Sequence, residues 1–238
     1  MLTVIDKLYQ QLKSSPVNIE QYIHDDVAWR VSAPINDLLG SAEVLTSFWQ
    51  PLVNALPDIE RKPFINVQSE YKGQDWIAST GYFVGTLRQP LWGIPANNKT
   101  LYLRYTELVQ LENNKIKQCF IIVDFLDAMN QVGVNPLRKS LGHSGLIMPP
   151  STMDGVVRAE SSVDAAKKSE RLILDMLDEL GRFDGKSLSS MKLENYWHPD
   201  FMWYGPAGIG TTRGIEGFRR DHQGPFVFSF PDRDVDHK

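Results

Sequence analysis

Asp124 is the first residue whose type and position indicate chemistry. By the two-residue period of a β-strand, it shares one face with the even-numbered residues from Ile116 to Ile122. That face is largely apolar, and a carboxylate at its end, lining a dry pocket, can exchange protons near neutral pH. Such a base would serve an aldol-type cyclisation, or an isomerisation next to a carbonyl. The alternative is that Asp124 caps the turn that follows it, Phe125 to Asn130.

Tyr105 and Glu107 are expected to assist this base. They follow Leu101 and Leu103 at alternate positions, so all four side chains point to the same face of the preceding strand. In an antiparallel sheet they would lie beside Asp124 and would position a carbonyl or orient the base. The alternative is that Glu107 pairs with a surface lysine on the outer face of the sheet.

Aromatic residues are candidates for lining a pocket that takes a flat polycyclic ligand. The alternative is that they fill the core, as buried aromatic residues usually do. In the C-terminal part His222 is the polar candidate, because it accompanies the pair Trp203 and Tyr204. The aromatic candidates of the N-terminal part are Trp29, Trp49, Tyr82 and Trp92.

Composition argues against several classes of protein. The formal net charge of -4 disfavours a nucleic-acid partner, and no run of about 18 apolar residues predicts a membrane span. The single cysteine, Cys119, excludes an internal disulfide, and the five histidines lack metal-binding spacing. We therefore expect a cytoplasmic protein with a small-molecule ligand, no metal and no cofactor.

Helices precede strands in the elements that must position these residues. Apolar residues recur at helical spacing between Leu2 and Leu12. Asn97-Asn98 and Asn113-Asn114 favour tight hairpin turns between later strands. This order predicts an α+β domain in which a curved antiparallel meander packs its concave face over the helices. The expected strands are roughly residues 62–71, 76–87, 99–111 and 115–123.

The chain also aligns with itself at an offset of 174 residues, which indicates an internal duplication. The aligned identities include two tryptophans and a repeated Pro-Asp, and a second helical pattern, Ala166 to Leu180, precedes the second copy. We expect a complete domain at 1–135, a linker at 136–163, and the N-terminal half of a second domain at 164–238, which makes the second unit truncated. The identical pairs are Tyr22/Tyr196, His24/His198, Asp26/Asp200, Trp29/Trp203, Gly40/Gly214, Pro51/Pro225, Pro57/Pro231 and Asp58/Asp232.

Three stretches of the chain resemble one family. Gly93-Ile94-Pro95 is followed by a turn and the basic Lys99, and the strand that ends at Asp124 leads to Gln131-Val132-Gly133. The third stretch runs from Trp203 to Arg233 and is similar to the first half of such a domain. These stretches resemble the SnoaL-like family of polyketide and ester cyclases, which has the cone-shaped, cystatin-like fold of nuclear transport factor 2 and ketosteroid isomerase.

The resemblance implies a fold and an activity. The fold would be two tandem cone-shaped α+β units, the second cut short. The activity would be cofactor-independent acid/base cyclisation or isomerisation of a carbonyl compound of the polyketide type, with Asp124 in the place of the family's aspartate. The alternative is a noncatalytic ligand-binding or dimerisation module of the same fold. Because a partial unit exposes apolar surface, we also expect a homodimer.

Overall fold

The computed structural model describes residues 3–12, 19–145, 147 and 162–233. These residues form two compact units. The N-terminal unit holds the described residues up to Pro136, and the C-terminal unit holds residues 137–147 and 162–233. None of the described helices is long and apolar enough to cross a membrane.

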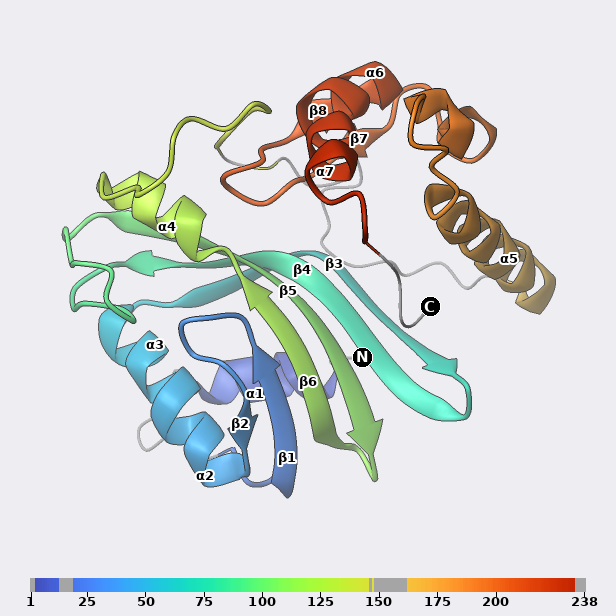
Figure 1. Cartoon of the computed structure of the whole chain (residues 1–238). Helices are drawn as coiled ribbons and strands as arrows, with labels where there is room; N and C mark the ends of the chain where they lie inside the picture. Colours follow the sequence, from blue (N-terminus) through green and yellow to red (C-terminus); the bar gives the residue numbers. More distant parts are fainter. Residues whose placement is uncertain (1–2, 13–18, 146, 148–161, 234–238) are drawn as a thin grey trace. The chain divides into compact units, whose positions relative to one another are not determined.

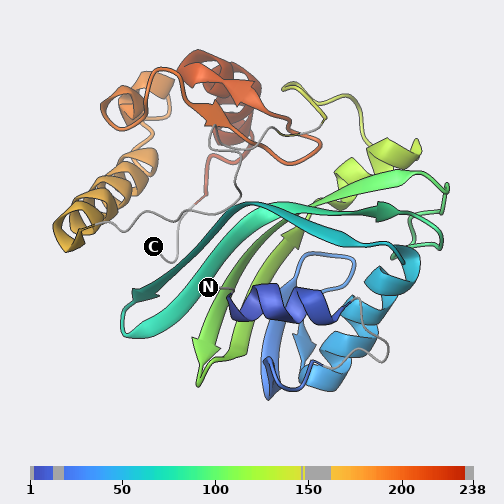
Figure 2. The same ribbon diagram turned by 180° about the vertical axis from the view of Figure 1, so that it is seen from behind.

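The N-terminal unit is a curved six-stranded sheet with α1, α2 and α3 on one face (Figure 1). The strand order is β2-β1-β6-β5-β4-β3, and all neighbours are antiparallel except β1 and β6, which run parallel. Figure 2 shows the unit from the opposite side, with α1 lying across the strands. The elements are α1 (Val4–Gln11), β1 (Ile23–Val31), β2 (Leu38–Leu39), α2 (Ser41–Val44), the π-helix η1 (Leu45–Trp49), α3 (Gln50–Ala55), β3 (Glu60–Tyr71), β4 (Gln74–Thr86), β5 (Thr100–Glu112), β6 (Lys115–Val123) and α4 (Phe125–Val132).

The expected meander is confirmed. The four strands predicted from the sequence correspond to β3, β4, β5 and β6, with ends that differ by no more than two residues. Asn113 and Asn114 join β5 to β6 with φ values of 50° and 59°, as a tight hairpin requires. The sequence did not reveal that β1 lies beside β6. The two strands are far apart in the sequence, and no local signal indicates that they pair in parallel.

Alternation along β5 shows which face of the sheet is covered. Its odd-numbered residues from Leu101 to Leu111 are buried, whereas Tyr102 and Leu108 are exposed. The buried face meets the aromatic residues of the helices, including Phe48 and Trp49. The prediction that Tyr105 and Glu107 share a face with Leu101 and Leu103 is confirmed, and that face is the inner one.

The prediction for the face of β6 was wrong. Phe120 and Ile122 are exposed, and the buried residues are Cys119, Ile121 and Val123. The cause is a register shift against β5 next to Ile116, which is itself buried. Such a bulge adds one residue, so every later side chain changes face. The alternating run that ends in Asp124 therefore belongs to the outer side of the sheet.

The edge strand β3 carries its own irregularity. Its pairing with β4 shifts between Pro63 and Ile65, opposite Gly81. A Cβ atom on Gly81 would lie 2.3 Å from the carbonyl oxygen of Lys62 and 2.6 Å from the Cα of Pro63. Only glycine allows the two backbones to approach this closely.

The C-terminal unit is mostly helical. Its π-helix occupies the positions of η1 at the 174-residue offset, and the pairing of Met202 with Arg213 corresponds to that of Ala28 with Leu39. Its elements are α5 (Val163–Leu180), the 3₁₀ turns η2 (Leu188–Met191) and η3 (Leu193–Asn195), β7 (Met202–Trp203), β8 (Thr212–Arg213), α6 (Gly214–Phe218), the π-helix η4 (Arg219–Gln223) and α7 (Gly224–Ser229).

The close approach at Gly81 yields a stability prediction. We expect Gly81→Ala to destabilise the N-terminal unit by about 2 to 3 kcal/mol, because backbone atoms cannot move aside as a side chain can. Gly73→Ala is the matched control: its φ is 73°, but no atom lies within 4 Å of the added Cβ, so the cost should be about 1 kcal/mol. Urea unfolding measures both, and equal losses would contradict the prediction.

Candidate active site

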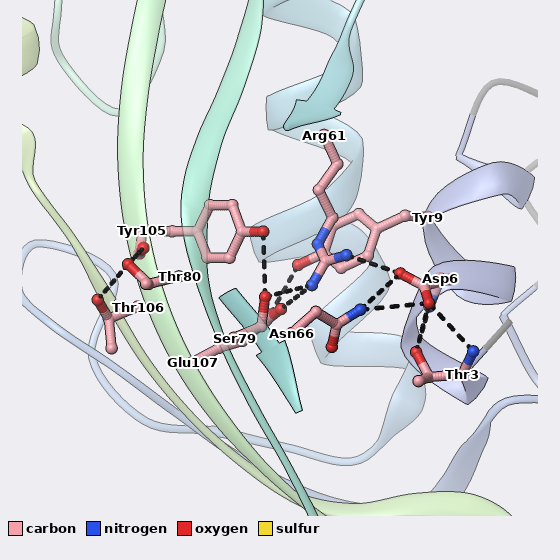
Figure 3. A network of polar contacts seen from close by, with 10 residues as sticks. All are labelled: Thr3, Asp6, Tyr9, Arg61, Asn66, Ser79, Thr80, Tyr105, Thr106 and Glu107. Atoms are coloured by element: carbon pink, nitrogen blue, oxygen red, sulfur yellow. Dashed lines mark hydrogen bonds and ion pairs between the residues drawn. The ribbon is translucent and has the colours of Figure 1, made fainter. Parts of the chain in front are cut away.

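A buried guanidinium organises the polar residues beneath the sheet. Arg61 of β3 donates to Glu107 Oε1 at 2.7 Å, to Ser79 Oγ at 2.7 Å and to Asp6 Oδ1 at 2.9 Å. Asn66 also donates to Asp6, at 3.1 Å. Figure 3 shows that the network joins α1 to the inner face of three strands. We refer to Asp6, Tyr9, Arg61, Asn66, Ser79, Tyr105 and Glu107 as the interior network.

Glu107 is the most deeply buried acid of the interior network. Its side chain is 0% exposed, and its Oε2 accepts a hydrogen bond from the Tyr9 hydroxyl at 2.8 Å. Desolvation by burial raises the pKa of Glu107 above its ordinary value, and the contacts with Arg61 and Tyr9 oppose that rise. Glu107 is thus suited to hold a proton at a pH where an exposed glutamate is ionised. The alternative in which Glu107 pairs with a surface lysine was wrong.

Two tyrosines flank Arg61. The guanidinium carbon lies 4.5 Å from the centre of the Tyr9 ring and 5.4 Å from that of Tyr105. Burial raises the pKa of both phenols, with a further rise from the nearby Glu107, so both hydroxyls stay protonated. The hydroxyls of Tyr105 and Ser79 are 3.4 Å apart, a long contact that leaves Tyr105 able to donate elsewhere.

The interior network has more acidic than basic groups, and two of its buried polar atoms lack a hydrogen bond within the described residues. One guanidinium faces two carboxylates, and Asp6, with 20% of its side chain exposed, is the better solvated of the two. Arg61 Nε and Asn66 Oδ1 are buried and have no hydrogen-bond partner among the described residues. A buried unpaired polar atom costs about 1 to 3 kcal/mol. The arrangement can therefore take up a proton and can hydrogen-bond an added polar group.

Asp124 lies in a different environment. It is the N-cap of α4, where its Oδ1 accepts from the backbone N–H of Asp127 at 3.1 Å, and its Oδ2 accepts from Arg104 Nη2 at 2.8 Å. Arg104 and Asp124 have side chains only 14% and 7% exposed. The capping alternative thus describes its local geometry. Arg104 alternates with Tyr105, so the Asp124 pair lies across the sheet from Glu107.

The predicted aromatic residues and His222 are not brought together around one pocket. Trp29 and Trp49 are fully buried and pack edge to face with centroids 5.7 Å apart, inside the core. Trp92 packs on Phe125 and donates from Nε1 to the carbonyl of Ser47. Tyr82 lies on the outer face with Tyr102, and His222 lies in the C-terminal unit.

With this geometry in place, comparison with known proteins identifies the family. Residues 3–132, more than half of the chain, match the model of the SnoaL-like polyketide cyclases. The chain belongs to this family. The match contains the whole interior network and Asp124, so the SnoaL-like domain is the N-terminal unit. No curated protein matches the chain.

Solved structures similar to this SnoaL-like protein include candidate polyketide cyclases from three bacteria. IdmH of Streptomyces antibioticus is 19% identical, with 55% of this chain and 96% of IdmH covered and a TM-score of 0.46. A protein of Jannaschia sp. CCS1 is 12% identical, with 56% and 91% covered and a TM-score of 0.46. One from Xanthomonas campestris pv. campestris is 15% identical, with 54% and 93% covered and a TM-score of 0.43.

Sequence reasoning missed five members of the interior network: Asp6, Tyr9, Arg61, Asn66 and Ser79. One signal was present: Asp6 and Tyr9 are three residues apart on a predicted helix, and so share a face. Nothing marked Arg61, which is one charged residue among several at the start of β3. Among the described residues, no group of three or more His, Cys, Asp or Glu side chains could hold a metal ion.

The raised pKa of Glu107 predicts a pH dependence of stability. In the unfolded chain the carboxyl group of Glu107 has a pKa near 4.5, whereas in the folded protein it retains its proton to higher pH. Its contribution is complete below the unfolded pKa and is lost as the pH rises through the folded pKa. The unfolding free energy of the wild type should therefore fall relative to that of Glu107→Gln as the pH rises above the unfolded pKa of the glutamate.

Urea unfolding at a series of pH values measures this difference. Glu70→Gln, at an exposed position on β3, is the control and should leave the pH dependence unchanged. A Glu107→Gln difference that stays constant with pH, or that changes in the opposite direction, would show that folding does not raise the pKa of Glu107.

The cap at Asp124 gives a second stability prediction. Asp124→Asn keeps an oxygen for the Asp127 N–H but removes the charge opposite Arg104, so the melting temperature should fall. Asp124→Ala removes the cap as well and should cost about 1 kcal/mol more. Asp37→Asn, in an exposed pair with Arg30, serves as control and should have no measurable effect. Calorimetry that ranks Asn equal to Ala would contradict the capping role.

Proposed function

We propose that the SnoaL-like domain catalyses cofactor-independent acid/base cyclisation or isomerisation of a carbonyl compound of the polyketide type, with Glu107 as the proton carrier. The observation that carries the proposal is a fully buried carboxyl group with a raised pKa, held by Tyr9 and Arg61. Family membership supports the substrate class.

The residues of the interior network have complementary roles in this proposal. Glu107 exchanges a proton with the carbon next to the carbonyl, and the proton returns to the product from the same carboxyl group. The Tyr105 hydroxyl donates to the oxygen on which negative charge develops, and Arg61 stabilises that charge. In this proposal the substrate reaches the interior network beside α1, because Asp6 of α1 is the more exposed of the two acids in the network.

Asp124 is the second candidate for the proton carrier, because it matches the family's aspartate. Its contacts with Arg104 and with the N-terminus of α4 favour a structural role instead. The noncatalytic ligand-binding module is the alternative function. It is favoured by the place of Asp124, which caps α4 instead of facing a cavity among the described residues.

An exchange assay distinguishes these possibilities. The full chain is incubated in D₂O with a panel of linear and cyclic 1,3-diketones and keto esters, and loss of the protons next to the carbonyls is followed by NMR. We expect catalysed exchange that Glu107→Gln lowers by about 10²-fold to 10⁴-fold. Asp124→Asn should stay within a factor of a few.

The reverse ranking of the two variants would assign the proton transfer to Asp124. Binding of panel members without catalysed exchange would favour the noncatalytic module. Glu70→Gln is again the control, because it removes a carboxylate of the same unit at an exposed site.

We also propose that the two units are tandem copies. The support is the coincidence of their π-helices, of the prolines that follow them, and of the glycines with positive φ that precede them, Gly40 and Gly214. A π-helix is rare enough that its recurrence at one spacing favours common descent over independent origin.

A further inference from the structure

The C-terminal unit contains a cavity that the proposed function does not use. Its volume is about 650 Å³, within the range of pockets that bind small molecules. All its lining residues belong to the C-terminal unit, from the end of α5 to the residues after α7. Most are apolar, and they include Trp197, Trp203 and Phe226.

Two polar residues replace core aromatic residues on this scaffold. At the 174-residue offset, His222 corresponds to Phe48 and Gln223 to Trp49. Phe48 and Trp49 are fully buried and pack on each other in the N-terminal unit. The same turn of π-helix thus carries two packed rings in one unit and two hydrogen-bonding side chains beside a cavity in the other.

Gln223 is buried, and the oxygen of its side-chain amide accepts no hydrogen bond from the described residues. The residue is 3% exposed, and its Nε2 donates to the sulfur of Met191 at 3.3 Å. Its Oε1 accepts no hydrogen bond from any described residue. Because leaving a buried acceptor unpaired is costly, Gln223 needs a donor from outside the described chain, and it lines the cavity.

Aromatic rings next to Gln223 offer a stacking surface. The His222 ring stacks on Trp203 with centroids 4.1 Å apart and planes at 15°, and it stacks less closely on Phe226 at 5.7 Å. Burial lowers the pKa of His222, so its imidazole is uncharged at neutral pH. This side of the cavity suits a flat, uncharged ring.

The charges around the cavity exclude one class of ligand. No aspartate or glutamate lines it, and Arg233 is the one lining residue among those described that carries a permanent charge. The Arg233 guanidinium lies over the rings of Phe183 and Phe226, and it donates to the backbone carbonyl of Phe230 at 3.1 Å. A cationic ligand would meet no counter-charge there.

We propose that this cavity binds a small neutral aromatic alcohol, with its ring among the aromatic residues and its hydroxyl donating to Gln223 Oε1. The proposal is independent of the acid/base chemistry proposed for the N-terminal unit. It assigns to the C-terminal unit a ligand site of its own, in which Gln223 selects for a hydrogen-bond donor.

Titration calorimetry of the full chain with 1-naphthol and with its methyl ether tests the proposal. The two probes share a ring system, but the ether has no donor. We expect naphthol to bind at least about tenfold more tightly, which corresponds to the roughly 1.4 kcal/mol of one satisfied hydrogen bond. Gln223→Leu should abolish that preference and leave binding of the ether unchanged, whereas Gln89→Leu, outside the cavity, should change neither.

A second variant fills the cavity. Gln223→Trp introduces the residue found at the corresponding position of the N-terminal unit and should abolish binding of both probes while circular dichroism stays unchanged. Equal affinities of the wild type for the two probes, or no binding of either, would overturn the proposal. So would a dimer in light scattering that 1-naphthol leaves intact and Gln223→Trp dissociates, because a second copy would then cover the cavity. Should Gln223→Trp fail to fold, the Gln223→Leu comparison still decides.

Discussion

The Arg61 guanidinium is the interaction on which the interior of the SnoaL-like domain depends. It contacts α1 through Asp6, β4 through Ser79 and β5 through Glu107, and these residues are far apart in the sequence. A buried charge of this kind is tolerated only when its partners satisfy it. One side chain therefore links the position of α1 over the sheet to the burial of Glu107 and to the two tyrosine rings. Asp6 also forms a capping box with Thr3, so the same carboxylate starts α1 and fixes it to the sheet.

The fold was predictable from the sequence to the extent that its signals are local. Alternating residues and paired asparagines placed four strands, and alternation along β5 placed Tyr105 and Glu107 on the same face as its leucines, without telling whether that face is the inner one. The face of β6 was not predictable, because a one-residue bulge near Ile116 leaves no mark in the residue types. Nor was the role of Arg61, whose partners come together only when the sheet forms. The catalytic prediction for Asp124 rested on the wrong face of β6, and its local environment is that of a cap.

The two units carry different side chains on similar local elements. Both contain a π-helix flanked by short helices, with a tryptophan of a preceding strand, Trp29 or Trp203, close to it. In the N-terminal unit Phe48 and Trp49 of this element are aromatic and pack in the core, and the buried polar groups lie around Arg61. In the C-terminal unit the polar groups are on the π-helix itself. Trp49 in the N-terminal unit is stabilised by packing, whereas the buried amide of Gln223 in the C-terminal unit also needs hydrogen-bond partners.

The irregular edge strand β3 has a consequence for the solubility of the chain. An outermost strand usually presents a regular row of unpaired donors and acceptors, which is a template for another strand. In β3, Pro63 contributes no N–H, and the register shift beside it interrupts the spacing of the groups that remain. Charged residues such as Glu60 and Lys62 further discourage an approaching backbone. The bulge that lets the sheet bend at Gly81 thereby also protects its edge from aggregation by strand addition.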